Sequence, residues 1–189
     1  MIRYLIGFFV TIGLIILLIV LLFSGGGTKA PSKKVPTGKA LSSYANTDAQ
    51  VRVTLDGPIN AVENHRQVQI TVGRDNAVAN VLQGYDGTVI ETKTVANTES
   101  SYSAFLHSLE LLGFTHGVTN NPSLKSEVGH CATGTRYVFE VLQQGEQIER
   151  FWATSCGGPH SYLGNISTTL SLFKQQVPEY NKLQTINNF

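Results

Sequence analysis

The chain has 189 residues, of which 42% are hydrophobic and 14% charged, and its formal net charge is +1. This length is sufficient for one globular domain of ordinary size and a further segment. All 13 acidic residues lie at or after Asp48, so residues 48–189 carry a net charge of −4, with nine basic residues against 13 acidic ones. A mildly acidic domain repels nucleic-acid phosphates, which excludes nucleic acid from the expected partners.

The first predicted element is a membrane-spanning helix. Residues 4–23 read YLIGFFVTIGLIILLIVLLF and contain no charged side chain. At about 1.5 Å per residue, this run is long enough for the roughly 30 Å hydrocarbon core of a bilayer. It is longer than the apolar region of a signal peptide, about 7–15 residues, and the segment SGGGTKAPS follows it. We therefore predict that residues 1–24 form a retained, single-pass membrane anchor.

Residues 25–47 are predicted to be a flexible linker, because Gly, Pro, Lys and Ser predominate there without apolar periodicity. The lysines of this segment would keep the following domain in the cytoplasm under the positive-inside rule. However, a first helix commonly acts as a signal anchor, and long domains translocate largely regardless of charge. Two cysteines in the domain favour an oxidising compartment. We therefore expect residues 48–189 to lie outside the cytoplasm, at the cell envelope.

Residues 51–96 predict four antiparallel strands. The segments VRVTL and QVQITVG alternate between apolar and polar residues, and each ends in turn-forming residues, which is typical of half-buried strands. AVANVLQGY and VIETKTV form the next pair. We expect a two-residue hairpin turn at Asp86 and Gly87 to join them.

A helix is predicted after these strands. Apolar residues recur at spacings of three and four positions from Tyr102 to Leu112, and Gly113 ends the pattern. Asn97 or Thr98 can cap the helix at its amino terminus. Residues 114–130 then show no periodicity, and the sequence leaves their role open.

The last part of the chain predicts a second hairpin and a second helix. RYVFEVLQQGEQIERFWATSC turns at Gln144 and Gly145, and the helix begins near Asn165 and stops before Pro178. The order ββββ-α-ββ-α indicates an α+β domain, with an antiparallel sheet of about six strands and both helices on one face.

The second hairpin brings Cys131 and Cys156 within two positions of facing each other. One bulge or irregularity in the ATGT segment before Arg136 would align them. Facing residues have Cβ atoms about 4.5–5.5 Å apart, slightly more than the mean for a disulfide, so a modest adjustment lets the bond form. The sequence therefore predicts a disulfide between these cysteines. It would close a loop of about 26 residues and stabilise the fold by about 3 kcal/mol.

Other roles for the cysteines stay open at the level of sequence. Cys131 and Cys156 could bind zinc with His130 and His160, although adjacent ligands point in different directions and the spacing is unusual. Cys156 could instead be a nucleophile, with His160 as its base and the amides of residues 157–158 as an oxyanion nest. No recognised cysteine-hydrolase signature surrounds Cys156. We expect neither a metal site nor a cofactor.

Residues at and after the end of the second hairpin are candidates for ligand binding. They are Trp152, Gly157, Gly158, His160 and Tyr162. A tryptophan beside a glycine-rich loop can stack on a sugar or a peptide, but covering the sheet is the simpler role. We also expect Glu140 and Glu149 to face each other across the hairpin. Facing carboxylates can carry out glycosidic acid and base chemistry, but Arg136 and Arg150 are near enough to neutralise them, and a solvated face of the sheet is the favoured interpretation.

Several segments together resemble a group of uncharacterised, single-span membrane-anchored proteins of small-genome candidate-phylum bacteria. These segments are LDGPINA, NHR, LQGYDG, GHCATGTRYVFE, ERFWATSCGGP and LGN, and the resemblance covers residues 40–185. It implies a bacterial, envelope-located protein and assigns no activity and no functional residue. The chain shows no match to known transpeptidases, amidases or sortases.

The sequence therefore favours a membrane-anchored extracytoplasmic domain that binds a protein, peptide or glycan at the cell envelope, rather than an enzyme. The alternative is an envelope enzyme or a thiol-redox protein, in which Cys156 acts with His160 or with Cys131.

Overall fold

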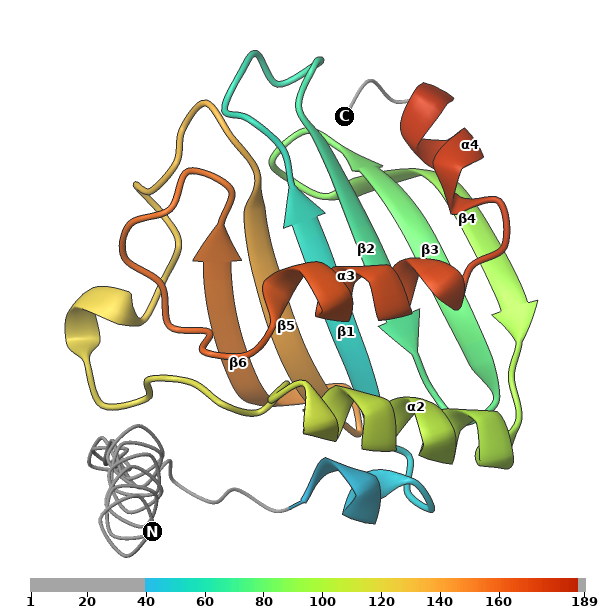
Figure 1. Cartoon of the computed structure of the whole chain (residues 1–189). Helices are drawn as coiled ribbons and strands as arrows, with labels where there is room; N and C mark the ends of the chain where they lie inside the picture. Colours follow the sequence, from blue (N-terminus) through green and yellow to red (C-terminus); the bar gives the residue numbers. More distant parts are fainter. Residues whose placement is uncertain (1–39, 187–189) are drawn as a thin grey trace, which may run out of the picture. The chain divides into compact units, whose positions relative to one another are not determined.

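The computed structural model describes residues 40–186, which form one sheet with helices packed against it (Figure 1). The predicted anchor at residues 4–23 and residues 25–39 of the predicted linker lie outside this range. Between residues 40 and 186, no helix has both the length and the apolar character that a bilayer crossing requires.

An antiparallel sheet of six strands is the centre of the domain. Its strands are β1 (Gln50–Asp56), β2 (Arg66–Val72), β3 (Asn76–Gln83), β4 (Thr88–Ala96), β5 (Arg136–Gln143) and β6 (Glu146–Thr154), in the spatial order β4-β3-β2-β1-β5-β6. The first four strands form a meander, and the β5–β6 hairpin joins it because β5 pairs with β1. The sheet confirms the predicted α+β class and strand number.

Short and long helices complete the described domain. They are η1 (Leu41–Tyr44), α2 (Glu99–Leu111), η2 (Pro122–Leu124), α3 (Ile166–Gln175) and α4 (Tyr180–Ile186). Helices α2 and α3 cross the same face of the sheet (Figure 1). Each begins at a polar cap, because the Thr98 side chain accepts a hydrogen bond from an amide of α2 and the Asn165 side chain from one of α3. Helix α4 follows Pro178 and was not predicted from the sequence.

The hydrophobic core lies between the sheet and these helices. Burial alternates residue by residue along β1, so that Val53 is fully buried and Thr54 belongs to the opposite, more polar face. Phe105 of α2 meets Phe173 of α3 edge to face, with ring centroids 5.2 Å apart. The two helices are therefore packed on each other as well as on the sheet.

Residues 41–49 belong to the folded domain, although the sequence predicted a linker as far as residue 47. Leu41 is fully buried in the core. The amide of Ser42 donates a hydrogen bond of 2.9 Å to the Glu110 carboxylate of α2. Residues 41–49 are too few to show a periodic pattern in the sequence. They are ordered because they pack against a hydrophobic core that the sheet and the helices form. The predicted linker therefore overlaps the domain, which begins by Leu41.

The two hairpins differ in how closely they follow the predicted turns. The β5–β6 turn lies at Gln144 and Gly145, as predicted, with φ of 53° and 82°, and such left-handed conformations suit a two-residue hairpin. The β3–β4 connection instead contains the four residues 84–87, in which Gly84 and Gly87 both have φ of 73°. Each hairpin also has a register shift near its turn, which a β-bulge produces.

We predict that Leu41→Ala lowers the free energy of unfolding of the domain by about 3 kcal/mol, because it truncates a fully buried side chain. Asn46→Ala, at an exposed position of the same segment, should change it by less than about 0.5 kcal/mol. Urea denaturation followed by the fluorescence of Trp152 measures both variants. Equally small effects would mean that residues 41–47 act as a linker in solution.

Candidate functional site

Three ionisable side chains meet where β1 ends and where β2 and β5 begin. Asp56 is the last residue of β1 and pairs across the sheet with Arg136, the first residue of β5. His65 directly precedes β2 and is fully buried. We refer to Asp56, His65 and Arg136 as the ion cluster.

Arg136 connects the members of the ion cluster to the backbone. Its Nε and Nη2 lie 2.8 Å and 2.7 Å from Oδ2 of Asp56, and Nη2 donates a hydrogen bond of 2.6 Å to the Gly57 carbonyl. On the other side of the carboxylate, Nε2 of His65 lies 2.9 Å from Oδ1 of Asp56. The Arg136 side chain is only 5% exposed. Loss of one partner would therefore leave the other charge inside the protein without compensation.

The ion cluster is continuous with the β1–β2 loop, residues 57–65. The Nδ1 atom of His65 lies 3.1 Å from the Pro58 carbonyl, and the Ile59 amide donates a hydrogen bond of 2.8 Å to the Ala132 carbonyl. Tyr85, in the β3–β4 connection, stacks on His65 with ring centroids 4.1 Å apart. The Tyr85 hydroxyl donates a hydrogen bond of 2.7 Å to the carbonyl of Asn60. Three connections of the chain are thus held together at this end of the sheet.

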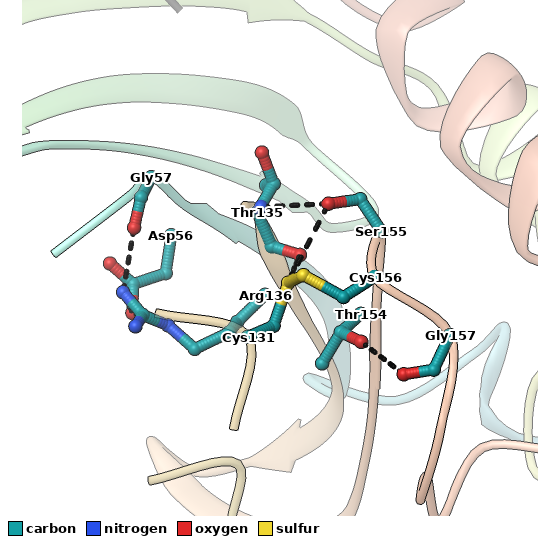
Figure 2. Close-up of a disulfide and its surroundings, with 9 residues drawn as sticks. All are labelled: Asp56, Gly57, Cys131, Thr135, Arg136, Thr154, Ser155, Cys156 and Gly157. Carbon is teal, nitrogen blue, oxygen red and sulfur yellow. Dashed lines mark hydrogen bonds and ion pairs between the residues drawn. A yellow bond between two sulfur atoms is a disulfide. The ribbon is translucent and has the colours of Figure 1, made fainter. Parts of the chain in front are cut away.

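The disulfide lies at the same end, beside Thr135 and Arg136 (Figure 2). Cys131 and Cys156 are bonded with their Cα atoms 5.6 Å apart, which confirms the predicted disulfide. Cys131 does not lie on β5, however, but in the turn before it, where φ is 51°. The amide of Gly134 donates to the Cys131 carbonyl across this turn. The turn, rather than the strand register, brings the two sulfurs together.

The turn before β5 packs closely on the residue that follows β6. The Ser155 amide donates a hydrogen bond of 2.9 Å to the Thr135 carbonyl. The Thr135 amide in turn donates one of 2.9 Å to Oγ of Ser155 (Figure 2). A Cβ atom on Gly134 would lie 2.5 Å from Oγ of Ser155 and 2.6 Å from Sγ of Cys131, so a larger residue has no room. This corner holds Arg136 in position at the start of β5.

The disulfide bears directly on the other roles considered for the cysteines. Each sulfur is bonded to the other, so neither is available as a thiolate nucleophile or as a zinc ligand in this oxidation state. His130 stacks on Trp152, with ring centroids 4.9 Å apart, and His160 is exposed with its Nδ1 2.9 Å from the Gly158 carbonyl. Among residues 40–186, no group of three or more His, Cys, Asp and Glu side chains is placed to hold a metal ion.

Two of the aromatic ligand-binding candidates lie inside the protein. Trp152 is fully buried, and its indole Nε1 donates to the Leu124 carbonyl at 2.6 Å. Tyr162 is 1% exposed and stacks on Phe139 with ring centroids 4.0 Å apart, and burial raises the pKa of its hydroxyl to about 12. Neither ring offers surface to a ligand. Gly157 and Gly158 are exposed turn residues with φ of 71° and 84°.

The segment that covers Trp152 is the loop at residues 114–130, whose role the sequence left open. Besides the bond from the Trp152 indole to Leu124, Nη1 of Arg150 donates to the Lys125 carbonyl, and Arg150 forms an ion pair with the Glu127 carboxylate. The loop is therefore structural over this stretch, because it closes the polar face of the sheet over β6.

Glu140 and Glu149 do not face each other, contrary to the sequence-based expectation. The register shift between Val141 and Leu142 places Glu140 opposite Arg150 and Glu149 opposite Val141, so the two carboxylates lie on different faces. Glu140 accepts a hydrogen bond of 2.7 Å from Nε of Arg52. Burial raises the pKa of the Glu149 carboxyl. A carboxylate pair of the glycosidase type is therefore absent from this hairpin.

Exposed apolar side chains line a cavity that Asp56 and Arg136 of the ion cluster also line. The cavity measures about 170 Å³, and its lining includes Ile59, Tyr85 and Val128 together with Asp56 and Arg136. Val128 is 79% exposed, and Ile59 and Tyr85 are about half exposed. Val62, three residues after Ile59 in the β1–β2 loop, does not line the cavity but is also exposed, at 58%. We call Ile59, Val62, Tyr85 and Val128 the apolar rim. A larger cavity, about 320 Å³, lies at residues 46–50 and 73–76 and is lined mainly by polar groups.

Sequence reasoning identified none of the residues of the ion cluster or the apolar rim as functional. The signal that was present is local: Ile59 and Val62 are apolar residues within a turn-rich segment, DGPINAVENH, where they cannot belong to a strand. Their grouping with Tyr85 and Val128 depends on contacts between distant segments. Comparison with protein-family models and with curated proteins finds no match for this chain.

We predict that Arg136→Met lowers the free energy of unfolding by about 3 kcal/mol, because Asp56 would keep its largely buried position without the guanidinium. Arg74→Met is the matched control. It removes a pair with Asp75 in which both side chains are exposed, and should cost less than about 0.5 kcal/mol. Denaturant titrations measure the difference. Equal costs for the two variants would contradict a structural role for the ion cluster.

Proposed function

We propose that this domain is a binding module that takes an apolar segment of a protein or peptide partner at the apolar rim. The observation that carries the proposal is the exposure of four large apolar side chains on three connections that are themselves fixed by hydrogen bonds, stacking and the ion cluster. Loops held by a rigid scaffold are the usual place for binding residues. Three of these side chains line one cavity, and grouped exposed apolar side chains are typical of an interaction surface.

The chemistry of the rim favours a protein or peptide over a glycan. Three of its four side chains are aliphatic, and the one aromatic ring, Tyr85, already stacks on His65. The charges beneath the rim are paired, Asp56 with Arg136 and Glu127 with Arg150. A partner would therefore contact apolar side chains at the rim and, beneath them, charged groups that already neutralise each other. Such a surface suits an aliphatic or aromatic anchor side chain that becomes buried on binding.

We also propose that binding takes place at the cell envelope, with residues 4–23 as the membrane anchor. The support is the uncharged run of 20 residues and the disulfide between Cys131 and Cys156, because structural disulfides persist in oxidising compartments. Because both cysteine sulfurs are held in this disulfide, we prefer a binding module over an enzyme that uses a free thiol.

We predict that a photo-crosslinking amino acid placed at Ile59 or at Val128 of the full chain, in the envelope of producing cells, gives the same covalent adduct from both positions. Leu111, at the end of α2, is the matched control, because it is apolar and 75% exposed but lies away from the rim. It should give no such adduct. Adducts of equal yield from Leu111, or none from either rim position, would contradict the proposal.

A second variant separates loss of binding from loss of folding. With the crosslinker at Val62, replacement of Ile59 and Val128 by serine should lower the adduct yield at least about tenfold, as expected when anchor side chains are removed. Because these side chains are exposed, the unfolding free energy should change by less than about 1 kcal/mol. An unchanged adduct yield in a folded variant would exclude the rim as the binding surface.

A further inference from the structure

The two edges of the sheet differ in how the chain covers them. The outer side of β6 is occupied, because the amides of Ser161 and Tyr162 both donate to the Trp152 carbonyl and the Trp152 amide donates to Oγ of Ser161. Strand β4 is the other edge (Figure 1). In residues 40–186, neither a strand nor an isolated bridge pairs with its outer side. A nine-residue strand with such an edge can pair with a further strand.

The register of β4 shows which of its backbone groups point outward. The Asn97 amide donates to the Asp75 carbonyl, so these residues form a hydrogen-bonded pair. Hydrogen-bonded positions alternate along an antiparallel ladder, and Glu91, Lys93 and Val95 therefore turn their backbone groups toward β3. Thr92 and Thr94 therefore direct their amide and carbonyl groups away from β3, toward the outer side of β4.

The side chains of β4 form a self-complementary sequence, TVIETKTVA, centred on Thr92. If two copies of β4 pair antiparallel with Thr92 opposite Thr92, Glu91 of each copy lies opposite Lys93 of the other. These positions are then non-hydrogen-bonded pairs, in which side chains are closest. A shift by two residues in either direction instead opposes Glu91 to Glu91 or Lys93 to Lys93. Within its own chain the Lys93 ammonium also lies 3.2 Å from the Glu179 carboxylate, so Glu91 of the second copy would be its second acidic neighbour. Charge complementarity therefore favours the register centred on Thr92 over its two neighbours.

We propose that β4 pairs with β4 of a second copy of this chain, antiparallel and centred on Thr92, to give a symmetric dimer with one continuous sheet. The register shift next to Leu82 leaves Ile90 as an extra residue, so the three central pairs use regular backbone. Pairing would also cover part of the apolar surface of Val89 and Ile90, which are exposed in the single chain. The dimer is independent of the apolar rim and of the proposed function.

Disulfide trapping of the full chain tests the register. The chain has two cysteines, both in the native disulfide, so Thr92→Cys introduces a single free thiol. In the proposed dimer the two Cys side chains lie opposite each other, with Cα atoms about 5.5 Å apart, and mild oxidation should link most of the chains. Ala96→Cys is the control, because the two positions would lie about 26 Å apart. Equal linking of both variants, or of neither, would overturn the proposal.

Charge exchange provides an independent measurement on the full chain in detergent. Glu91→Lys replaces two attractive pairs by two repulsive ones and should raise the dissociation constant of the dimer about tenfold, as measured by sedimentation equilibrium. Combining it with Lys93→Glu and Glu179→Gln restores opposite charges across the dimer without placing a second carboxylate beside Glu179, and should return the constant to within about threefold of the original. A monomeric parent chain, or failure of the combined change to restore a folded variant, would overturn the proposal.

Discussion

The carboxylate of Asp56 is the point on which the organisation of this domain depends. It ends β1, and it receives the guanidinium of Arg136 from β5 on one side and faces the imidazole of His65 on the other. These contacts join the four-stranded meander to the β5–β6 hairpin. Asp56 and Arg136 are 80 positions apart in the sequence. The guanidinium of Arg136 offsets the cost of burying the Asp56 carboxylate, whereas Oδ1, 2.9 Å from Nε2 of His65, accepts no hydrogen bond from residues 40–186. Because the carboxylate and the guanidinium need each other, their pair favours one arrangement of the connections that carry them.

The disulfide and the ion cluster stabilise the same end of the sheet in different ways. The bond between Cys131 and Cys156 closes a chain segment with a sequence separation of 25 and limits the unfolded ensemble, whereas the ion cluster acts within the folded state. Between them lies the turn that ends at Thr135. Because this end is rigid, apolar side chains on its surface can stay exposed at fixed positions. Preorganisation of that kind reduces the entropy lost when a partner binds.

Sequence reasoning succeeded where structure follows from neighbouring residues. Alternation, helix caps and the turn at Gln144 predicted the six strands and helices α2 and α3. The hairpin register placed the two cysteines close enough to predict their bond, although the turn before β5 completes their approach. It failed where structure depends on distant contacts. The pairing of Asp56 with Arg136 requires knowing which strand β5 joins, and a single extra residue in β6 separated Glu140 from its expected partner. Sequence reasoning favoured packing of Trp152 on the sheet, which its burial confirms, but the loop that completes this burial has no periodicity and was left open.

Hydrogen exchange of the Ile59 and Asn60 amides in the free protein tests the central claim most directly, namely that the loop carrying the apolar rim is ordered before any partner binds. The first amide donates to the Ala132 carbonyl and the second to the Tyr85 hydroxyl. We expect both to exchange at least about a hundredfold more slowly than in an unstructured peptide. Exchange at the rate of an unstructured peptide would mean that the ion cluster does not hold the loop.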